Sequence, residues 1–340
     1  MKPFTVLSLI PTGIGASFGG YAGDGAPATN LLACAADRLI THPNALNAAT
    51  FFARRPNILY VEGYALDRFV EGAWALREVR ANRIGLILDR AAEHTLPSLL
   101  NVCNALRASA GLSIEGVALT DAPVGARVVT GTNGISSGEV ENPGTLLDAA
   151  EKLVRAGAEA VAIACSLEGG DDENYIQGRG PDPIGGLEAI LSHLVVSQLG
   201  VPAAHAPAEL PWTPDGVVPP LVAAEACGSY LPSILIGLSQ APPLVPVADR
   251  KRGDLTAEDI DLLVAPHSCF GGAPMFACKR SGIPMLAVRE NETVLSVPPE
   301  ALGMEAIAVS SYLEAAGVIL AMKEGISLAS LRRPLLGVSP

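Results

Sequence analysis

Short, unbroken apolar runs alternate along the chain with longer segments in which the apolar residues are spaced out. Continuous runs of this kind, rich in Val, Ile, Leu and Ala, are typical of strands that are buried on both faces of a parallel sheet. The pattern predicts strands over residues 4–10, 84–89, 115–121, 160–165, 233–238, 261–266 and 284–290.

The longer segments carry apolar residues at intervals of three and four, which is the spacing of one helix face. In LLDAAEKLVRAG, for example, Leu146, Ala150 and Leu153 share a face. Gly157 follows as a typical helix stop. The same spacing predicts helices over residues 27–39, 96–109, 144–157, 184–199, 272–282 and 310–325. Strands that alternate with helices predict an α/β fold, with mostly parallel sheet layers flanked by helices.

The chain length adds a division into two parts. A chain of 340 residues is longer than one hydrophobic core usually supports. The proline-rich segment over residues 202–220 is a natural connection between two units. We therefore expect two α/β halves that share a cleft. Residues 1–205 would form the N-terminal half with a glycine-rich loop, and residues 206–340 the C-terminal half with a His-Ser-Cys loop.

Composition limits the classes of partner and the cellular compartment that we expect for the protein. Apolar residues make up 49% of the chain and charged residues 17%, which is typical of a packed α/β protein. The 35 acidic and 23 basic residues give a formal charge of −12, which would repel the phosphates of nucleic acids. The apolar run FTVLSLI ends at Pro11 and is too short to span a membrane. We expect a cytoplasmic homodimer with a small-molecule substrate and with neither nucleic acid nor membrane as a partner.

The stretch IPTGIGASFGGYAGDGAPATN, residues 10–30, places a glycine-rich loop between the first strand and the first helix. In open α/β folds, ligands bind at this carboxyl edge of the sheet, and bare glycine backbone can approach an anion. The loop matches neither a P-loop nor the dinucleotide fingerprint, so we expect no cofactor. A purely structural turn is the alternative. The candidate substrate-binding residues of this loop are Thr12, Gly13, Gly15, Ser17, Gly19, Gly20 and Asp24.

The segment PHSCFGGAP holds the most reactive combination of side chains. Cys269 follows a buried strand and precedes a helix expected to begin near Ala273, whose N-terminus would stabilise a thiolate. His267 would assist this thiol, and the backbone N–H groups of Gly271 and Gly272 would hold an oxyanion or a carboxylate. Cys269 is therefore a candidate nucleophile or proton-transfer group, and a packed thiol is the alternative. The six cysteines form no CxxC pair, so we expect them to be reduced.

Other polar residues also follow predicted strands or lie in loops near them. His42 and His205 are candidate catalytic residues, because histidine titrates near neutral pH and is the commonest general acid or base. Arg179 could bind a substrate carboxylate through two hydrogen bonds. The substrate-binding candidates outside the two glycine-containing loops are Asn44, Arg179, Glu290 and Asn291.

Several of these motifs occur together and in one order. They are IPTGIGASFGGYAGD, LITHPNALN, YVEGYALD, NPGTLLDAAEKLVRAGAEAVAIAC, GPDPIGGLEAILSHLVV, AHAPAE, LPSILIGLSQAP and HSCFGG followed by AVRENET. In this order the chain resembles the bacterial and plastid domain-of-unknown-function family numbered 3326 over nearly its whole length. The resemblance implies one family unit throughout, with the two halves forming a shared cleft, and it brings no established activity.

The residues favour a cofactor-independent enzyme that acts on a small carboxylate-bearing metabolite. Cysteine and histidine would supply acid-base or nucleophilic chemistry, as in a racemase or isomerase or in a hydrolase of amides or rings. A metal-dependent hydrolase or lyase that uses His42, His193 and His205 is one alternative. A protein that binds a metabolite without catalysis is another.

Overall fold

Two parallel sheets organise the chain. The structure is a computed structural model, and it describes residues 2–47, 55–131, 135–170, 173–209, 216–226, 230–335 and 337. Within these residues the two larger sheets have six and four strands, and both consist of parallel pairs throughout. The predicted α/β fold, with parallel sheet layers flanked by helices, is confirmed.

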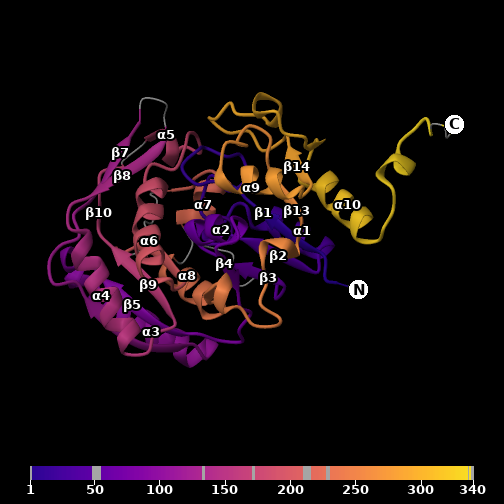
Figure 1. The fold of residues 1–340 in the computed structure, drawn as a ribbon. Coiled ribbons are helices and arrows are strands. Elements are labelled where there is room, and N and C mark those ends of the chain that lie inside the picture. The colour runs from indigo at the N-terminus through magenta and orange to yellow at the C-terminus, as the bar shows by residue number, and fades with distance from the viewer. Residues whose placement is uncertain are drawn as a thin grey trace.

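The first sheet combines strands from both ends of the chain. Its centre is the pair β1 and β13, which lie side by side in Figure 1 although one is indigo and the other orange. The predicted run FTVLSLI forms β1, and all four residues of this strand are buried. In spatial order the sheet contains β15 (Ile307–Val309), β14 (Met285–Val288), β13 (Ile260–Pro266), β1 (Thr5–Ser8), β2 (Arg38–Thr41) and β3 (Ile58–Tyr60).

The second sheet comes from the middle of the chain and has two small ribbons beside it. In order it contains β11 (Ala203–Pro207), β9 (Ala160–Cys165), β5 (Arg83–Leu88) and β6 (Ser113–Leu119). One ribbon consists of β10 (Leu167–Glu168), β7 (Ala126–Thr130) and β8 (Ser136–Val140), and the other of β12 (Leu244–Pro246) and β4 (Trp74–Leu76). The predicted boundary between residues 205 and 206 therefore does not separate the two large sheets, because the first sheet needs both chain ends.

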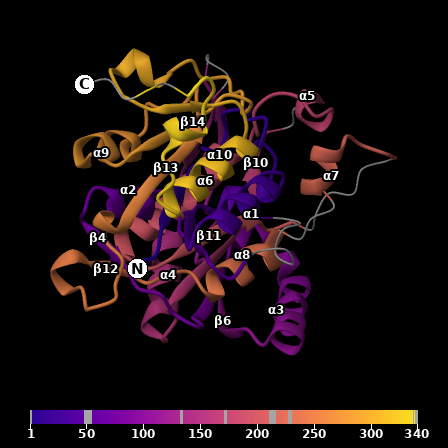
Figure 2. The same cartoon turned by 90° about the vertical axis from the view of Figure 1, so that its right-hand side faces the viewer.

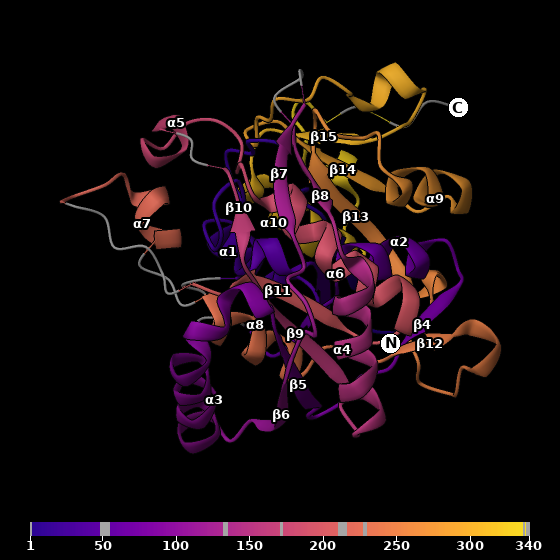
Figure 3. The same ribbon diagram turned by 90° about the vertical axis from the view of Figure 1, so that its left-hand side faces the viewer.

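Helices cover both faces of each sheet. Their bounds are α1 (Ala26–Ala35), α2 (Gly63–Val70), α3 (Leu96–Ala110), α4 (Pro143–Arg155), α5 (Glu173–Ile176), α6 (Gly185–Leu199), α7 (Pro220–Ala226), α8 (Tyr230–Ser239), α9 (Ala273–Ser281) and α10 (Tyr312–Lys323). One apolar core includes residues of α1, α3, α8 and α10, and the other includes residues of α2, α4, α6 and α9. Figure 2 shows α10 near α1 and α8 near α3, and Figure 3 shows α4 and α6 in front of the second sheet. Each core contains strand residues of both sheets, so the two sheets pack as one body.

One predicted strand is wrong. Residues 233–238, SILIGL, belong to α8 and not to a strand. A short apolar run that is buried on all sides has no periodicity that distinguishes the two structures. In the described part of the chain no single helix has the length and apolar character of a membrane span, and only the bent pair α7 and α8 meets these criteria together.

Helix α6 approaches the ribbon strand β8 closely at its first turn. Two glycines begin the helix, and an ideal Cβ placed on Gly186 would lie 2.1 Å from the carbonyl oxygen of Ser136. The Oγ of Ser136 also accepts a hydrogen bond from the N–H of Gly186, at 3.1 Å. Only glycine permits this backbone contact, which sets the position of the N-terminus of α6.

We expect Gly186→Ala to destabilise the protein by about 3 kcal/mol, because the new methyl group would meet backbone that has no room to move. The matched control is Gly144→Ala in the first turn of α4, where an added Cβ would meet nothing within 4 Å. That variant should be unchanged or more stable by up to about 1 kcal/mol. Urea unfolding of both variants measures the difference. Equal stabilities of the two variants would contradict the close packing of α6 on β8.

Candidate functional site

A cavity of about 540 Å³ lies where the carboxyl ends of the two sheets meet. Residues that follow β1, β2 and β13 line it from the first sheet, and the end of β11 lines it from the second. Helix α6 runs along the wall and contributes side chains from its first three turns. Ligands of parallel α/β folds bind at this edge, so the cavity is the candidate functional site.

The cavity wall is acidic. Carboxyl groups and imidazoles line it, but among its described lining residues there is neither Lys nor Arg. The carboxyl and imidazole groups of the wall are those of Glu62, Asp67, Asp182, Glu188, Glu225, His42, His193 and His205. A carboxylate-bearing substrate would therefore enter a site that offers it no cationic side chain except a protonated histidine.

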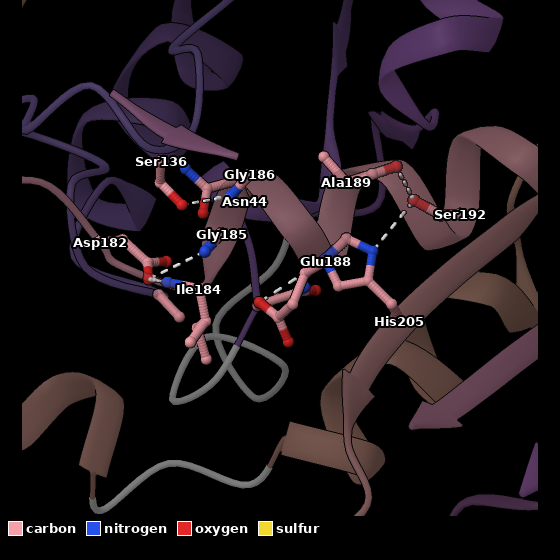
Figure 4. Close-up of polar contacts among 12 residues, drawn as sticks. Asn44, Ser136, Asp182, Ile184, Gly185, Gly186, Glu188, Ala189, Ser192 and His205 are labelled. Carbon is pink, nitrogen blue, oxygen red and sulfur yellow. Dashed lines mark hydrogen bonds and ion pairs between the residues drawn. The ribbon is translucent and has the colours of Figure 1, made fainter. Parts of the chain in front are cut away.

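Three side chains at the wall form a polar array, which Figure 4 shows. The hydroxyl of Ser192 donates to the carbonyl oxygen of Ala189 at 3.2 Å, so its oxygen is left to accept from Nδ1 of His205 at 3.0 Å. This arrangement places the imidazole proton on Nδ1 and the lone pair on Nε2. The Nε2 atom faces Oε2 of Glu188 at 3.8 Å, which is longer than a hydrogen bond.

Burial shifts both titratable members of this array toward their neutral forms. Burial lowers the pKa of His205 to about 3, and the nearby charge of His193 lowers it further in the same direction. Burial raises the pKa of Glu188 well above its ordinary value, and repulsion from Asp182 and Glu225 adds to this effect. A carboxyl that burial shifts toward its protonated form thus faces an unprotonated imidazole across a gap that opens into the cavity.

Asp182 holds the beginning of α6 and also faces the cavity. Its Oδ1 accepts from the backbone N–H groups of Ile184 and Gly185 at 2.9 and 3.0 Å. These two hydrogen bonds stabilise the charged carboxylate, but burial outweighs them and raises the pKa of Asp182 to about 6. The side chain is thus a helix cap whose protonation state can change near neutral pH.

In a second acid and imidazole pair, the pKa of the imidazole is shifted in the opposite direction. His193 on α6 forms an ion pair with Glu62, whose side chain is 3% exposed and whose other oxygen caps α2 by accepting from the N–H of Ala65 at 3.1 Å. Burial disfavours the charged imidazole, but the hydrogen bond and the charge of Glu62, together with Asp67, outweigh it and raise the pKa of His193. The cavity therefore combines one histidine whose pKa is raised, His193, with one whose pKa is lowered, His205.

A third acidic group reaches the wall from α7. Burial raises the pKa of Glu225 to about 8, and the neighbouring carboxyls of Asp182 and Asp24 act in the same direction. Its Oε2 accepts from the backbone N–H of Ala22 at 3.1 Å and from the hydroxyl of Tyr175. These hydrogen bonds attach α7 to the glycine-rich loop and to α5.

The structure brings seven of the predicted site residues to this cavity. They come from three loops and from strand β11: Thr12, His42, Asn44, His205, Cys269, Gly271 and Gly272. Among them, His42 is buried, and its Nε2 accepts from the N–H of Ile10 at 3.0 Å. Burial lowers the pKa of His42 to about 4, so this imidazole is neutral and its Nε2 is occupied.

The glycine-rich loop lies outside the cavity apart from Pro11, Thr12 and Ala22. Its backbone donors are used within the protein: Phe18 donates to Asn291 at 3.0 Å and Gly19 to Asp24 at 2.6 Å. These two N–H groups therefore already have acceptors, and the anion cradle expected in this loop stays a prediction. The candidates placed in this folded loop, away from the cavity wall, are Gly13, Gly15, Ser17, Gly19, Gly20 and Asp24.

Four other candidates also lie away from the cavity. Glu290 accepts from the backbone N–H of Tyr312 at 2.6 Å, and Asn291 is buried between the glycine-rich loop and the hydroxyl of Tyr312. His267 lines a smaller pocket, where its Nε2 lies 3.5 Å from a carboxylate oxygen of Glu300. Arg179 is exposed and donates to Gln177. These side chains stabilise the fold or the surface, and only a rearrangement would bring them to the cavity.

The expectation of a stabilised thiolate at Cys269 is wrong. Cys269 lines the cavity, but it is 3% exposed and its thiol donates to the carbonyl oxygen of Pro266 at 3.4 Å. Burial raises the pKa of this thiol to about 12, because no positive charge compensates for the loss of water. Five cysteines are free thiols, and Cys227 lies outside the described residues.

Sequence reasoning missed the acidic side chains of the wall. Glu188 and Ser192 are spaced four residues apart in α6, so they share a helix face with each other and not with Leu187 and Leu191. These polar residues in the otherwise apolar helix α6 were the sequence signal that could have indicated a polar site. Glu225 follows a proline-rich stretch, and no local pattern marked it.

The histidine-based metal site of the alternative reading gains no support. His42, His193 and His205 all line the cavity. Nevertheless, among the described residues no group of three or more His, Cys, Asp or Glu side chains has the arrangement of a metal site.

Comparisons with known proteins agree with the resemblance seen in the motifs. The model of a family described as "Protein of unknown function (DUF3326)" matches residues 5–332. The chain belongs to this family. It is also 41% identical over 338 residues to a protein of Synechococcus sp. named an uncharacterized lipoprotein, which covers 97% of this chain and 94% of that relative. No solved structure matches the chain.

The relative corrects the predicted location. A lipoprotein carries a covalently attached lipid, and such a lipid draws a protein to a membrane. The name of this relative, which is similar to the chain over nearly its whole length, therefore contradicts our prediction of a cytoplasmic protein.

We expect iodoacetamide to modify the exposed Cys34 of the folded protein long before the buried Cys269 near neutral pH. A thiol whose pKa is raised to about 12 has almost no thiolate at that pH, and burial also blocks the reagent. Peptide mass mapping at a series of times measures both rates, and urea-unfolded protein serves as the control in which the two rates should converge. Faster modification of Cys269 in the folded state would restore it as a candidate nucleophile.

We expect Asp24→Asn to gain stability relative to the native chain as the pH rises. Burial raises the pKa of Asp24 to about 7, against the three backbone hydrogen bonds it accepts. Above its unfolded pKa the unfolded chain loses this proton while the folded chain retains it, so native stability falls with pH until the folded pKa is passed. The difference should reach the order of 2 kcal/mol between about pH 4 and pH 8.

Urea unfolding at both pH values measures this effect, and Asp148→Asn, at an exposed position of α4, is the matched control. The control should show the same pH dependence as the native chain. If the stability gain of Asp24→Asn does not change with pH, Asp24 is not held in its protonated form.

Proposed function

We propose that this chain is a cofactor-independent enzyme that transfers protons on a small molecule held in the cavity, with Glu188 as the acid and His205 as the base. The observation that carries the proposal is the neutral pair they form, with a gap of 3.8 Å that opens into the cavity. Pairs of titratable groups whose surroundings shift their pKa values apart are typical of acid-base active sites.

The array supplies both halves of a proton shift. The carboxyl of Glu188 gives its proton to one atom of the substrate, and Nε2 of His205 takes a proton from another. The carboxylate left on Glu188 then raises the basicity of the imidazole beside it, because the charged pair attracts. Return of the proton from the imidazolium to the carboxylate restores both groups, so the net reaction is an isomerisation or racemisation that needs no other reactant.

Hydrolysis through a covalent intermediate is less well supported. Ser192 has the histidine partner that a serine nucleophile needs, but it is 1% exposed and its proton is donated to Ala189. Its contact with Nδ1 instead orients His205 and keeps the lone pair on Nε2. Cys269, the other nucleophile at the wall, has no thiolate near neutral pH.

A second candidate is a ligand-binding protein held at a membrane. Two observations favour it: the relative from Synechococcus sp. is named a lipoprotein, and the cavity lies between two α/β sheets, as in binding proteins that close around a solute. In this case the same cavity would retain a ligand and release it unchanged.

We expect the protein, incubated in D₂O with a mixture of small metabolites, to place deuterium at a carbon of at least one compound, as read by mass spectrometry. Glu188→Gln should lower this exchange rate by about a hundredfold or more, since a positioned acid or base contributes about 10²–10⁴. Glu305→Gln, at an exposed carboxyl, is the control and should leave the rate unchanged. Retention of a compound without any exchange would favour the binding protein instead.

A further inference from the structure

The cavity contains a group of carboxyls that no cation balances. Asp182, Glu188 and Glu225 all line the cavity, and repulsion from the other two carboxyls raises the pKa of Glu188. The groups that face them, Tyr175 and His205, carry no positive charge at neutral pH. The cation of the cavity wall, His193, is already paired with Glu62.

Open polar atoms point into the same space. Asp182 is 6% exposed, and only its Oδ1 has hydrogen-bond partners within the part of the chain that the structure describes. An ideal Cβ on Gly185 would lie 2.6 Å from Oδ2 of Asp182 and 2.6 Å from Oγ1 of Thr12, so both oxygens border the space that this glycine leaves open. The hydroxyl of Thr12 has no hydrogen-bond partner among the described residues either. Figure 4 shows Glu188 between Asp182 and His205.

We propose that the ligand of this cavity carries an ammonium group that lies between Asp182, Thr12 and Glu188. This inference rests on the proposed function for its site, but it concerns binding and not turnover. A primary ammonium has three N–H donors, and the three side chains offer an acceptor on each side of the open space. The ammonium group also supplies a positive charge that would compensate the negative charges of the buried carboxylates.

An organic cation fits better than a metal ion. A divalent metal ion takes several oxygen ligands at short range, and the described residues contain no group of three or more carboxyl, thiol or imidazole side chains arranged to do so. Much of the remaining wall is apolar, with Leu66, Ile234 and Leu295 among its residues. The ligand would therefore have an amine at one end and a small apolar body.

The test compares amines with neutral molecules of the same shape. Calorimetry measures the binding of putrescine and ethanolamine, with 1,4-butanediol and ethylene glycol as neutral counterparts and succinate and magnesium as further probes. We expect an amine to bind and its neutral counterpart not to bind. In two buffers of different ionisation enthalpy, amine binding should release protons near pH 7, because the cation favours ionised Asp182, Glu188 and Glu225.

Two variants locate the ammonium. Asp182→Asn keeps the Oδ1 acceptor that caps α6, so it should fold, and it should weaken amine binding by about tenfold or more. Asp148→Asn removes one exposed carboxyl of α4 and should leave binding unchanged. Equal binding by the amine and its neutral counterpart, tighter binding of succinate or magnesium, no binding of either amine, or an unchanged affinity in Asp182→Asn would overturn the inference.

The two proposals fail separately. Amine binding that Asp182→Asn weakens, without deuterium exchange on any compound, would remove the enzyme and keep the ammonium site. Deuterium exchange on a compound without an amine, lost in Glu188→Gln, would keep the enzyme and remove the ammonium site.

Discussion

The burial of polar side chains along one face of α6 is the constraint on which the site depends. Its apolar face, with Leu187 and Leu191, packs into the core that both sheets share. Its first turn is held against β8 by a glycine contact that no other residue permits, and by the cap from Asp182. Glu188 is thereby brought into the cavity, at a depth where a carboxylate without a cation is costly. The protonated form of Glu188, and the neutral imidazole opposite, follow from that cost.

Much of the fold could be predicted from local patterns. The central strands β1, β5, β9, β13 and β14 appear as apolar runs, and α3, α4, α6, α9 and α10 as amphipathic segments with clear ends. What the pattern could not supply is the pairing of β1 with β13, because pairing of strands from the two ends of the chain leaves no local signal. The strand predicted over the apolar run of α8 was wrong for a related reason. A segment that is buried on all sides lacks the alternation of apolar and polar residues that distinguishes a helix from a strand.

For the site, sequence reasoning found the edge of the sheets at which the cavity lies. It expected a site for an anion there, whereas the cavity wall carries carboxyl groups and neither Lys nor Arg among its described residues. His42, His205 and Cys269 follow strands, and the structure brings all three to one cavity. Whether backbone N–H groups of the loop bind an anion, however, depends on whether the protein already uses them, and those of Phe18 and Gly19 donate to Asn291 and Asp24. Whether a thiol is reactive depends on its surroundings, and burial raises the pKa of the Cys269 thiol, which disfavours the thiolate. Such effects arise from tertiary contacts, which spacing in the sequence does not encode.

The central claim is that His205 is neutral, with its proton on Nδ1, beside a protonated Glu188. The measurement that tests it most directly is ¹⁵N NMR of the histidine side chains in the full chain between about pH 5 and pH 8, with His205→Asn for assignment. Nitrogen shifts typical of a neutral Nδ1–H tautomer throughout this range are the predicted result, since burial lowers the pKa of His205 to about 3. A titration of His205 near its ordinary pKa of about 6.5 would contradict the neutral pair and, with it, the assignment of Glu188 and His205 as acid and base.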